Sequence, residues 1–185
     1  MKRLEDMTLK ELWELFPIVL TEHNEAWAEW AADETACLRE ILGTISARYH
    51  HIGSTAIKGI VSKPIVDIIV EVETAEAFSE IKERLINVGY ICMSESDCRM
   101  SFNKGYTPAG YADRVFHIHV RTAGDTDEIY FRDYLNCHED AAKEYESLKL
   151  TLSKTYKHNR DGYTRAKSSF VNHYTSIAKR AQKTT

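Results

Sequence analysis

The segment from Tyr49 to Val72 constrains the fold more strongly than any other part of this sequence. Two strand-like stretches, residues 47–52 and 65–72, flank a loop that begins with Gly53-Ser54. The second stretch consists mainly of Ile and Val, which is typical of a strand buried on both faces of a sheet. We therefore expect the chain to build its core around residues 65–72.

The same segment carries the strongest indication of chemistry. Glycine allows a close approach of the main chain, so a Gly53-Ser54 turn after a strand can present N–H groups and a hydroxyl to a phosphate. Asp67, at the start of the second strand, is placed to hold a metal ion against the same phosphates. The pattern predicts a phosphate and metal site where the turn meets this strand.

Hydrophobic periodicity predicts the other elements. Helices are expected over residues 9–16, 24–42 and 74–88, and strands over 90–93, 99–103 and 114–121, with a turn region at 105–110. Three more helices follow residue 124 and should pack on, or beside, the sheet. Residues 1–20 are interpreted as a helical extension that only packs on the surface. This order predicts one α+β domain over residues 1–185, with a mixed sheet flanked by helices and a C-terminal helical segment.

Composition excludes several classes of function. The net charge of −4 gives no basic footprint for duplex nucleic acid. No apolar run approaches the roughly 20 residues that span a bilayer, so no membrane segment is expected. The N-terminus is too acidic for a signal peptide, and the four cysteines form no Cys-x-x-Cys pair. These features predict a cytoplasmic protein.

Short motifs extend from the Gly53-Ser54 loop into the C-terminal third of the chain. The first block comprises His51-Ile52-Gly53-Ser54-Thr55-Ala56, Gly59, Lys63-Pro64-Ile65 and Asp67-Ile68. Later blocks are Phe116-His117-Ile118-His119-Val120, Phe131-Arg132-Asp133-Tyr134-Leu135, Glu144-Tyr145 with Leu148-Lys149, and Tyr163-Thr164 with Lys167. In this order they resemble the motifs of the GrpB family, over roughly residues 20–181. The resemblance implies a nucleotidyltransferase-like fold.

The resemblance also implies a function. Gly53 and Ser54 would hold the β and γ phosphates of a nucleoside triphosphate, and Asp67 would be the first ligand of a divalent ion, Mg²⁺ or Mn²⁺, and the catalytic acid. The resemblance implies binding of a nucleoside triphosphate or a related phosphorylated ligand, with metal-dependent nucleotidyl transfer as the activity. The superfamily pattern places a second acid at position 69, where this chain has Ile69. The alternative is therefore a non-catalytic nucleotide-binding or interaction module on the same fold.

Three further residues are candidate metal ligands. Strand alternation places Glu71 on the same face as Asp67, and His117 and His119 share a face of another strand. If that strand lies beside residues 65–72, the histidines complete a mixed Asp/His site. Imidazole suits zinc, nickel or iron better than magnesium, so a metal-dependent hydrolase is a third possibility. The simpler interpretation is that a histidine is a hydrogen-bonded core residue.

Basic residues are candidates for phosphate binding. Lys63 lies between the turn and Asp67, although a lysine before proline is also compatible with a simple loop cap. Arg132 can bind a phosphate or pair with a neighbouring acid such as Asp133. Lys167 and Lys149 lie on helical stretches, where a solvated face is the alternative to contact with a nucleotide.

Overall fold

The protein is described by a computed structural model that covers residues 2–182. Its helices are α1 (Leu9–Leu15), α2 (Ala26–Leu42), α3 (Phe78–Asn87), α4 (Asp127–Cys137), α5 (Glu139–Thr155) and α6 (Arg160–Gln182). Its strands are β1 (Ala47–Ile52), β2 (Val66–Val72), β3 (Ile91–Glu95), β4 (Arg99–Thr107) and β5 (Gly110–Thr122). Within residues 2–182, every helix is too short or too polar to cross a lipid bilayer.

The five strands form one mixed sheet in the order β1-β2-β5-β4-β3. β2 lies between antiparallel β1 and parallel β5, and β5 also pairs with antiparallel β4. The parallel pair joins segments that are far apart in the sequence. α3, β3 and β4 lie between β2 and β5 along the chain, and β5 is the central strand of the sheet. This arrangement confirms the expected α+β class with a mixed sheet.

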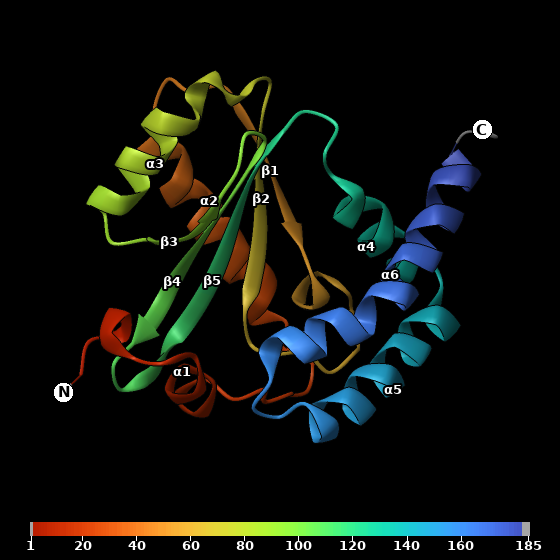
Figure 1. Cartoon of the computed structure of the whole chain (residues 1–185). Coiled ribbons are helices and arrows are strands. Elements are labelled where there is room, and N and C mark those ends of the chain that lie inside the picture. Colours follow the sequence, from red (N-terminus) through yellow and green to blue (C-terminus); the bar gives the residue numbers. More distant parts are fainter. Residues whose placement is uncertain (1, 183–185) are drawn as a thin grey trace.

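One face of the sheet is covered by α2 and α3 (Figure 1). Alternate residues of β2, from Val66 to Val72, point into this layer and are almost inaccessible to solvent. They pack with Trp27 and Leu38 of α2 and with Ile81 of α3. Burial of these apolar side chains supplies most of the stabilisation of this half of the molecule, at about 25 cal/mol per Å² of apolar surface.

The last three helices lie on the other side of the sheet as a separate group (Figure 1). Their core contains Phe131, Leu135, Ala142 and Tyr145, together with Ile57 and Ile60 from the loop after β1. Because these helices pack mainly against one another and that loop, the second face of the sheet keeps a polar surface. These helices meet the sheet domain through that loop and through contacts between α4 and β1.

Two expectations for the sheet and the N-terminus were wrong. β4 continues to Thr107 and β5 starts at Gly110, so the expected turn region is mostly a long hairpin. Gly105, Pro108 and Gly110 hid the strand character of this segment. The N-terminal segment also does more than lie on the surface: Phe16 and Ile18 are 2% and 4% exposed. The Ile18 amide donates to the carbonyl of Lys157, which ties this segment to the loop before α6.

Candidate functional site

A cavity of about 940 Å³ lies between the polar face of the sheet, α1 and α6. Its polar walls include residues from the loop after β1, from β2 and β5, and from α6. They also come from β4, from α4 and from the segment before α1, and are Glu5, Gly53, Ser54, Lys63, Asp67, Asn103, Tyr106, His117, His119, Glu128, Arg160, Asp161, Thr164 and Lys167. Leu9, Leu12, Trp13 and Phe16 supply an apolar wall from the N-terminal segment. The sequence did not predict that wall.

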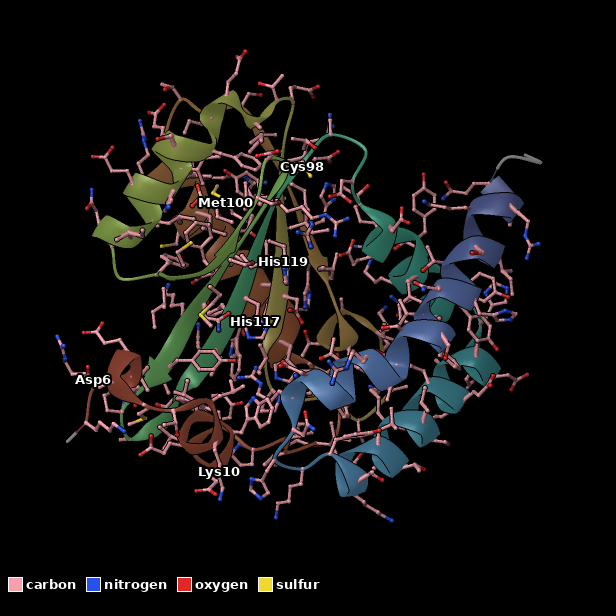
Figure 2. The ribbon with its side chains drawn as sticks, in the orientation of Figure 1. Asp6, Lys10, Cys98, Met100, His117 and His119 are labelled. Atoms are coloured by element: carbon pink, nitrogen blue, oxygen red, sulfur yellow. The ribbon has the colours of Figure 1, made fainter. Side chains whose placement is uncertain are left out.

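Asp67 is the centre of the polar wall because of the sheet register. Asp67 on β2 is paired with His117 on β5, and the next outward position of β5 is His119. Both rings donate to the same oxygen: Asp67 Oδ1 lies 3.2 Å from His117 Nδ1 and 3.1 Å from His119 Nε2. Figure 2 shows the two histidines following one another along β5. The expected meeting of Asp67 with both histidines therefore occurs.

The charge of Asp67 is held by these hydrogen bonds. Burial opposes ionisation of the carboxyl group, but the bonds from His117 and His119 outweigh it and lower its pKa. Burial also lowers the pKa of His117, despite the neighbouring carboxylate. These shifts describe a charged carboxylate that accepts from a neutral His117 imidazole.

Gly53 is required by the geometry at this carboxylate. Its backbone has φ 73° and ψ −172°, a region that is essentially restricted to glycine. A Cβ atom at this position would lie 2.4 Å from Asp67 Oδ2. The chain turns immediately afterwards into a short 3₁₀ segment, Ser54–Ala56. The Gly53-Ser54 turn thus packs directly on Asp67, as the sequence predicted.

A chain of hydrogen bonds leads from His117 to α6. The Tyr106 hydroxyl lies 2.7 Å from His117 Nε2 and accepts from Arg160 Nη2 at 2.7 Å. If Arg160 donates to Tyr106 and Tyr106 donates to His117, the Nδ1 proton of His117 faces Asp67. His119 has no such support, since its Nδ1 is buried without a partner within residues 2–182. The two imidazoles therefore differ in how firmly they are oriented.

Three cationic side chains face the cavity without acidic partners. Lys63, Arg160 and Lys167 all line it, and none makes an ion pair in the part of the chain that the structure describes. Lys63 and Lys167 both lie over the ring of Tyr163, at 5.7 and 4.5 Å from its centroid. Burial, reinforced by Lys167 and Arg160, lowers the pKa of Lys63 to about 7. Such a cluster favours the binding of an anion.

Glu71 lies on the same face of β2 but outside the cavity lining. It is 7% exposed, and its carboxylate accepts from Arg48 Nε at 3.0 Å and from the Gly124 amide at 3.1 Å. His50 Nε2 lies 3.1 Å away. The bond from Arg48 is the main cause that lowers the pKa of Glu71 to about 2, against the opposing effect of burial. Glu71 is thus paired with other groups and is not brought to Asp67.

Position 69 is closed to solvent. Ile69 has 0% exposure and lies between Asp67 and Glu71 along the strand, opposite His50 and His119. An apolar side chain therefore fills the space where the superfamily pattern has its second carboxylate. No group in residues 2–182 substitutes for that acid except the two histidines at Asp67.

Arg132 and Lys149 have partners away from the cavity. Arg132 donates to the carbonyl of His51 at 2.7 Å and pairs with Asp133. Pairing with this acid was the alternative to phosphate binding that the sequence left open. Lys149 contradicts its expected solvated face: it is 1% exposed and donates to the Val61 carbonyl. Burial lowers its pKa to about 7. Both side chains therefore organise the loop after β1 from the helices beside it.

Tyr106 and Arg160 were missed by the sequence analysis. Tyr106 falls in the segment interpreted as a turn, and Arg160 begins α6 in a stretch of polar residues. Extending the alternation of β4 past Lys104 would have drawn attention to Tyr106. Nothing in the sequence around Arg160 distinguishes it from a surface residue, because only the return of α6 to the sheet brings it to the cavity.

Comparison with known proteins identifies relatives along most of the chain. The model of the GrpB family, described as GrpB protein, matches residues 17–176. The glutamate-rich protein GrpB of Alkalihalophilus pseudofirmus is 37% identical over 160 residues, which cover 83% of this chain and 91% of that protein. The UPF0157 protein YqkA of Bacillus subtilis is 31% identical over 181 residues. These cover 95% of this chain but only 52% of YqkA, so the chain spans about half of that relative's length.

Solved structures show the same architecture. A crystal structure of the conserved protein GrpB from Enterococcus faecalis matches with a TM-score of 0.77 and 27% identity, covering 89% of this chain and 99% of that one. The Cid1 poly(U) polymerase, in a mutant form bound to MgATP, matches with a TM-score of 0.51 and 14% identity. That match covers 80% of this chain and 46% of Cid1 and concerns the fold alone. The fold is nucleotidyltransferase-like, as the motifs implied.

Proposed function

This chain belongs to the GrpB family, and we propose that it binds a nucleoside triphosphate or a related phosphorylated small molecule in the cavity between the sheet and α6. The observation that carries the proposal is the group of three unpaired cations, Lys63, Arg160 and Lys167, on the cavity wall. Unpaired cations at a half-buried site are costly unless an anion completes them. A polyphosphate supplies several negative oxygens for this purpose.

The Gly53-Ser54 turn provides the second element of the proposed site. Both residues line the cavity, and the turn packs against the carboxylate of Asp67. Gly53 lets the backbone come close to a ligand, and Ser54 adds a hydroxyl group. The turn on one wall and Arg160 and Lys167 of α6 on another are suited to hold successive phosphates of one chain. Thr164, also on α6, adds a hydroxyl to that second wall.

Nucleotidyl transfer is the second candidate activity, and Asp67 is the residue that favours it. The acid stands at the start of β2, beside the turn, where the resemblance places the catalytic metal ligand. Cid1 was solved with MgATP, and nucleotidyl transfer needs a metal ion to offset charge on the phosphoryl oxygens. The donors present here, one carboxylate and two imidazoles, do not suit Mg²⁺, and Ile69 replaces the second acid. We therefore propose binding of a phosphorylated ligand as the leading function and nucleotidyl transfer as the second candidate.

Ligand-induced stabilisation tests the binding proposal. We expect ATP and inorganic tripolyphosphate to raise the melting temperature of chelator-treated protein, and adenosine to leave it unchanged. Lys63→Met and Lys167→Met should each weaken ATP binding by about tenfold, the effect of losing about 1.4 kcal/mol. Lys154→Met, an exposed lysine on α5, is the matched control and should bind normally.

The same assay separates the outcomes. If neither ATP, GTP, UTP nor tripolyphosphate shifts the melting temperature, the proposal is wrong. Release of pyrophosphate above the level of Ser54→Ala and Asp67→Ala variants would establish transfer. Binding without turnover, in the presence of each divalent ion tried, would identify a binding module on the same fold.

A further inference from the structure

We propose that Asp67, His117 and His119 form a binding site for one first-row transition metal ion, of which Zn²⁺ is the representative, in preference to Mg²⁺. The ligand atoms of these three residues lie within 4.8 Å of one another. The residues come from two adjacent strands, so their spacing is set by the sheet and not by a flexible loop. The inference concerns the same cavity as the proposed function but does not depend on whether a phosphate binds there.

The distances at Asp67 match a tetrahedral ion. Zinc bonds to nitrogen or carboxylate oxygen are about 2.0–2.1 Å long, so ligand atoms around the ion are separated by about 3.3 Å. Asp67 Oδ1 lies 3.2 Å from His117 Nδ1 and 3.1 Å from His119 Nε2. Both oxygen–nitrogen separations therefore already fit bonds to a common ion, and the two nitrogens lie within 4.8 Å of each other.

The types of donor decide which ion is favoured. Mg²⁺ prefers carboxylate, carbonyl and water oxygens in octahedral geometry, whereas imidazole nitrogens suit Zn²⁺, Ni²⁺, Cu²⁺ and Fe²⁺. A second carboxylate would shift the balance toward Mg²⁺, but position 69 is a buried isoleucine and Glu71 is paired with Arg48 and Gly124. The site thus has one hard and two borderline ligands.

The three residues leave room for exogenous ligands. Their side chains are 25%, 17% and 22% exposed, in the order Asp67, His117, His119, and all three line the cavity. Asp67 Oδ2 is packed against Gly53, so only Oδ1 is directed at the histidines. Three protein ligands with an open side facing a cavity are typical of catalytic rather than structural zinc.

Metal binding changes which nitrogen of His117 carries the proton. In the hydrogen-bonded state Nδ1–H faces Asp67, whereas an ion bound at Nδ1 leaves the proton on Nε2. Nε2 lies 2.7 Å from the Tyr106 hydroxyl, which would then accept from His117 as well as from Arg160. Tyr106 is therefore the positioning residue of the site, because it orients the ring in both tautomers. His119 has no equivalent partner on its Nδ1.

The test is a metal titration of untagged, full-length protein after removal of metal by a chelator, with no phosphate present. We expect one equivalent of Zn²⁺ to bind in the micromolar range or tighter and to raise the melting temperature, even in a large excess of Mg²⁺. Co²⁺ should give visible d–d absorption bands of a four- or five-coordinate site. Asp67→Asn, His117→Gln and His119→Gln should each abolish the Co²⁺ bands.

His50→Gln is the matched control, because His50 lies on the same face of the sheet, hydrogen-bonded to Glu71 and away from the cavity. It should keep both the stoichiometry and the bands. Tyr106→Phe should keep all three ligands but weaken Zn²⁺ binding by about 10- to 100-fold, the usual effect of removing a hydrogen-bond partner of a metal ligand. Circular dichroism of each variant checks folding.

Two results would overturn the inference. One is the absence of stoichiometric Zn²⁺ or Co²⁺ binding to folded wild-type protein, and the other is binding that survives in the Asp67→Asn and His117→Gln variants. Neither result affects the ATP experiment in chelator, which tests the cations of the cavity. Conversely, a protein that binds Zn²⁺ but shows no melting-temperature shift with ATP or tripolyphosphate would contradict only the phosphate proposal. The two proposals are therefore tested separately.

Discussion

Asp67 and Glu71 stand four residues apart on the same face of β2, yet the two ends of that face differ in how charge is compensated. At the Glu71 end the carboxylate has Arg48, the Gly124 amide and His50 around it. At the Asp67 end the carboxylate has only two histidines, and the nearby cations have no acidic partner within the described residues.

The comparison shows that a lowered carboxyl pKa does not by itself identify a functional acid. Both groups are shifted downward, but Glu71 is shifted mainly by a salt bridge that completes its charge. The Asp67 end is the one that adjoins a cavity, and Lys63, Arg160 and Lys167 on its wall form no direct ion pair within the described residues. The pairing of the surrounding groups is thus a better guide to function than the shift itself.

Ile69→Asp should have the largest effect on the difference between the two ends of this face, because Ile69 lies between Asp67 and Glu71. Placing a carboxylate at a fully buried position between two acids should lower the free energy of unfolding by at least about 4 kcal/mol. Chemical denaturation measures it, with Ile69→Val as the control at about 0.5–1.5 kcal/mol. An Ile69→Asp protein of normal stability would show that this face accepts the second acid of the superfamily pattern.

Gly53→Ala tests the close packing at the Asp67 end. We expect a loss of about 2–4 kcal/mol, because the substitution combines a positive φ with an overlap against Asp67. Gly59→Ala is the matched control: its φ is also positive, but a Cβ there meets nothing within 4 Å, so the loss should be about 1–2 kcal/mol. Equal losses measured by denaturation would argue against a tight contact between the turn and Asp67.

Glu71→Gln tests the structural role of the other end. It should cost about 1–3 kcal/mol at pH 7 by weakening bonds to a buried acceptor, without changing ATP or Zn²⁺ binding. Because folding lowers the pKa of Glu71 to about 2 from 4.5, its stabilisation is complete above pH 4.5 and declines as the pH falls toward 2. The difference from wild type should therefore shrink over this range. Loss of Zn²⁺ binding in this variant would instead show that Glu71 and Asp67 belong to one site.

Substitutions of one cation at each end should have small effects of opposite sign. Lys63→Met should raise the melting temperature of the ligand-free protein by a few degrees, because it removes an uncompensated charge, while ATP binding falls. Arg48→Met should lower the melting temperature, because Glu71 loses a partner. Differential scanning calorimetry measures both, and a destabilising Lys63→Met would contradict the view that this lysine awaits an anion.

The gain from Lys63→Met should depend on pH. Folding lowers the pKa of Lys63 to about 7 from 10.5, so the unfolded chain binds more protons between these values. The wild-type protein therefore becomes more stable as the pH rises above 7, by at most about 1.4 kcal/mol per unit from this group. The gain should be full below pH 7 and fade above it. A constant gain from pH 6 to pH 9 would indicate that Lys63 keeps its ordinary pKa.

Much of the fold followed from local pattern. The Ile- and Val-rich stretch predicted a buried strand, which β2 is, with a neighbour on each side, and the helical stripes predicted α2 and α3 within a few residues. The hairpin of β4 and β5 was underestimated because polar residues and glycines interrupt it, whereas cross-strand pairing sustains it. The energy of strand pairing depends on the partner strand, about which the hydrophobic periodicity of one segment carries no information.

The site divides in the same way. The amino-acid sequence by itself determined the Gly53-Ser54 turn, the shared face of Asp67 and Glu71, and the shared face of His117 and His119, because these follow from local backbone rules. Only the tertiary structure decided that β5 inserts beside β2 and brings both histidines to Asp67, while Glu71 pairs with Arg48. It also decided that α6 returns with Arg160 and Lys167, whereas Lys149 is buried. The physical reason is that charge pairing and burial depend on neighbours distant in sequence.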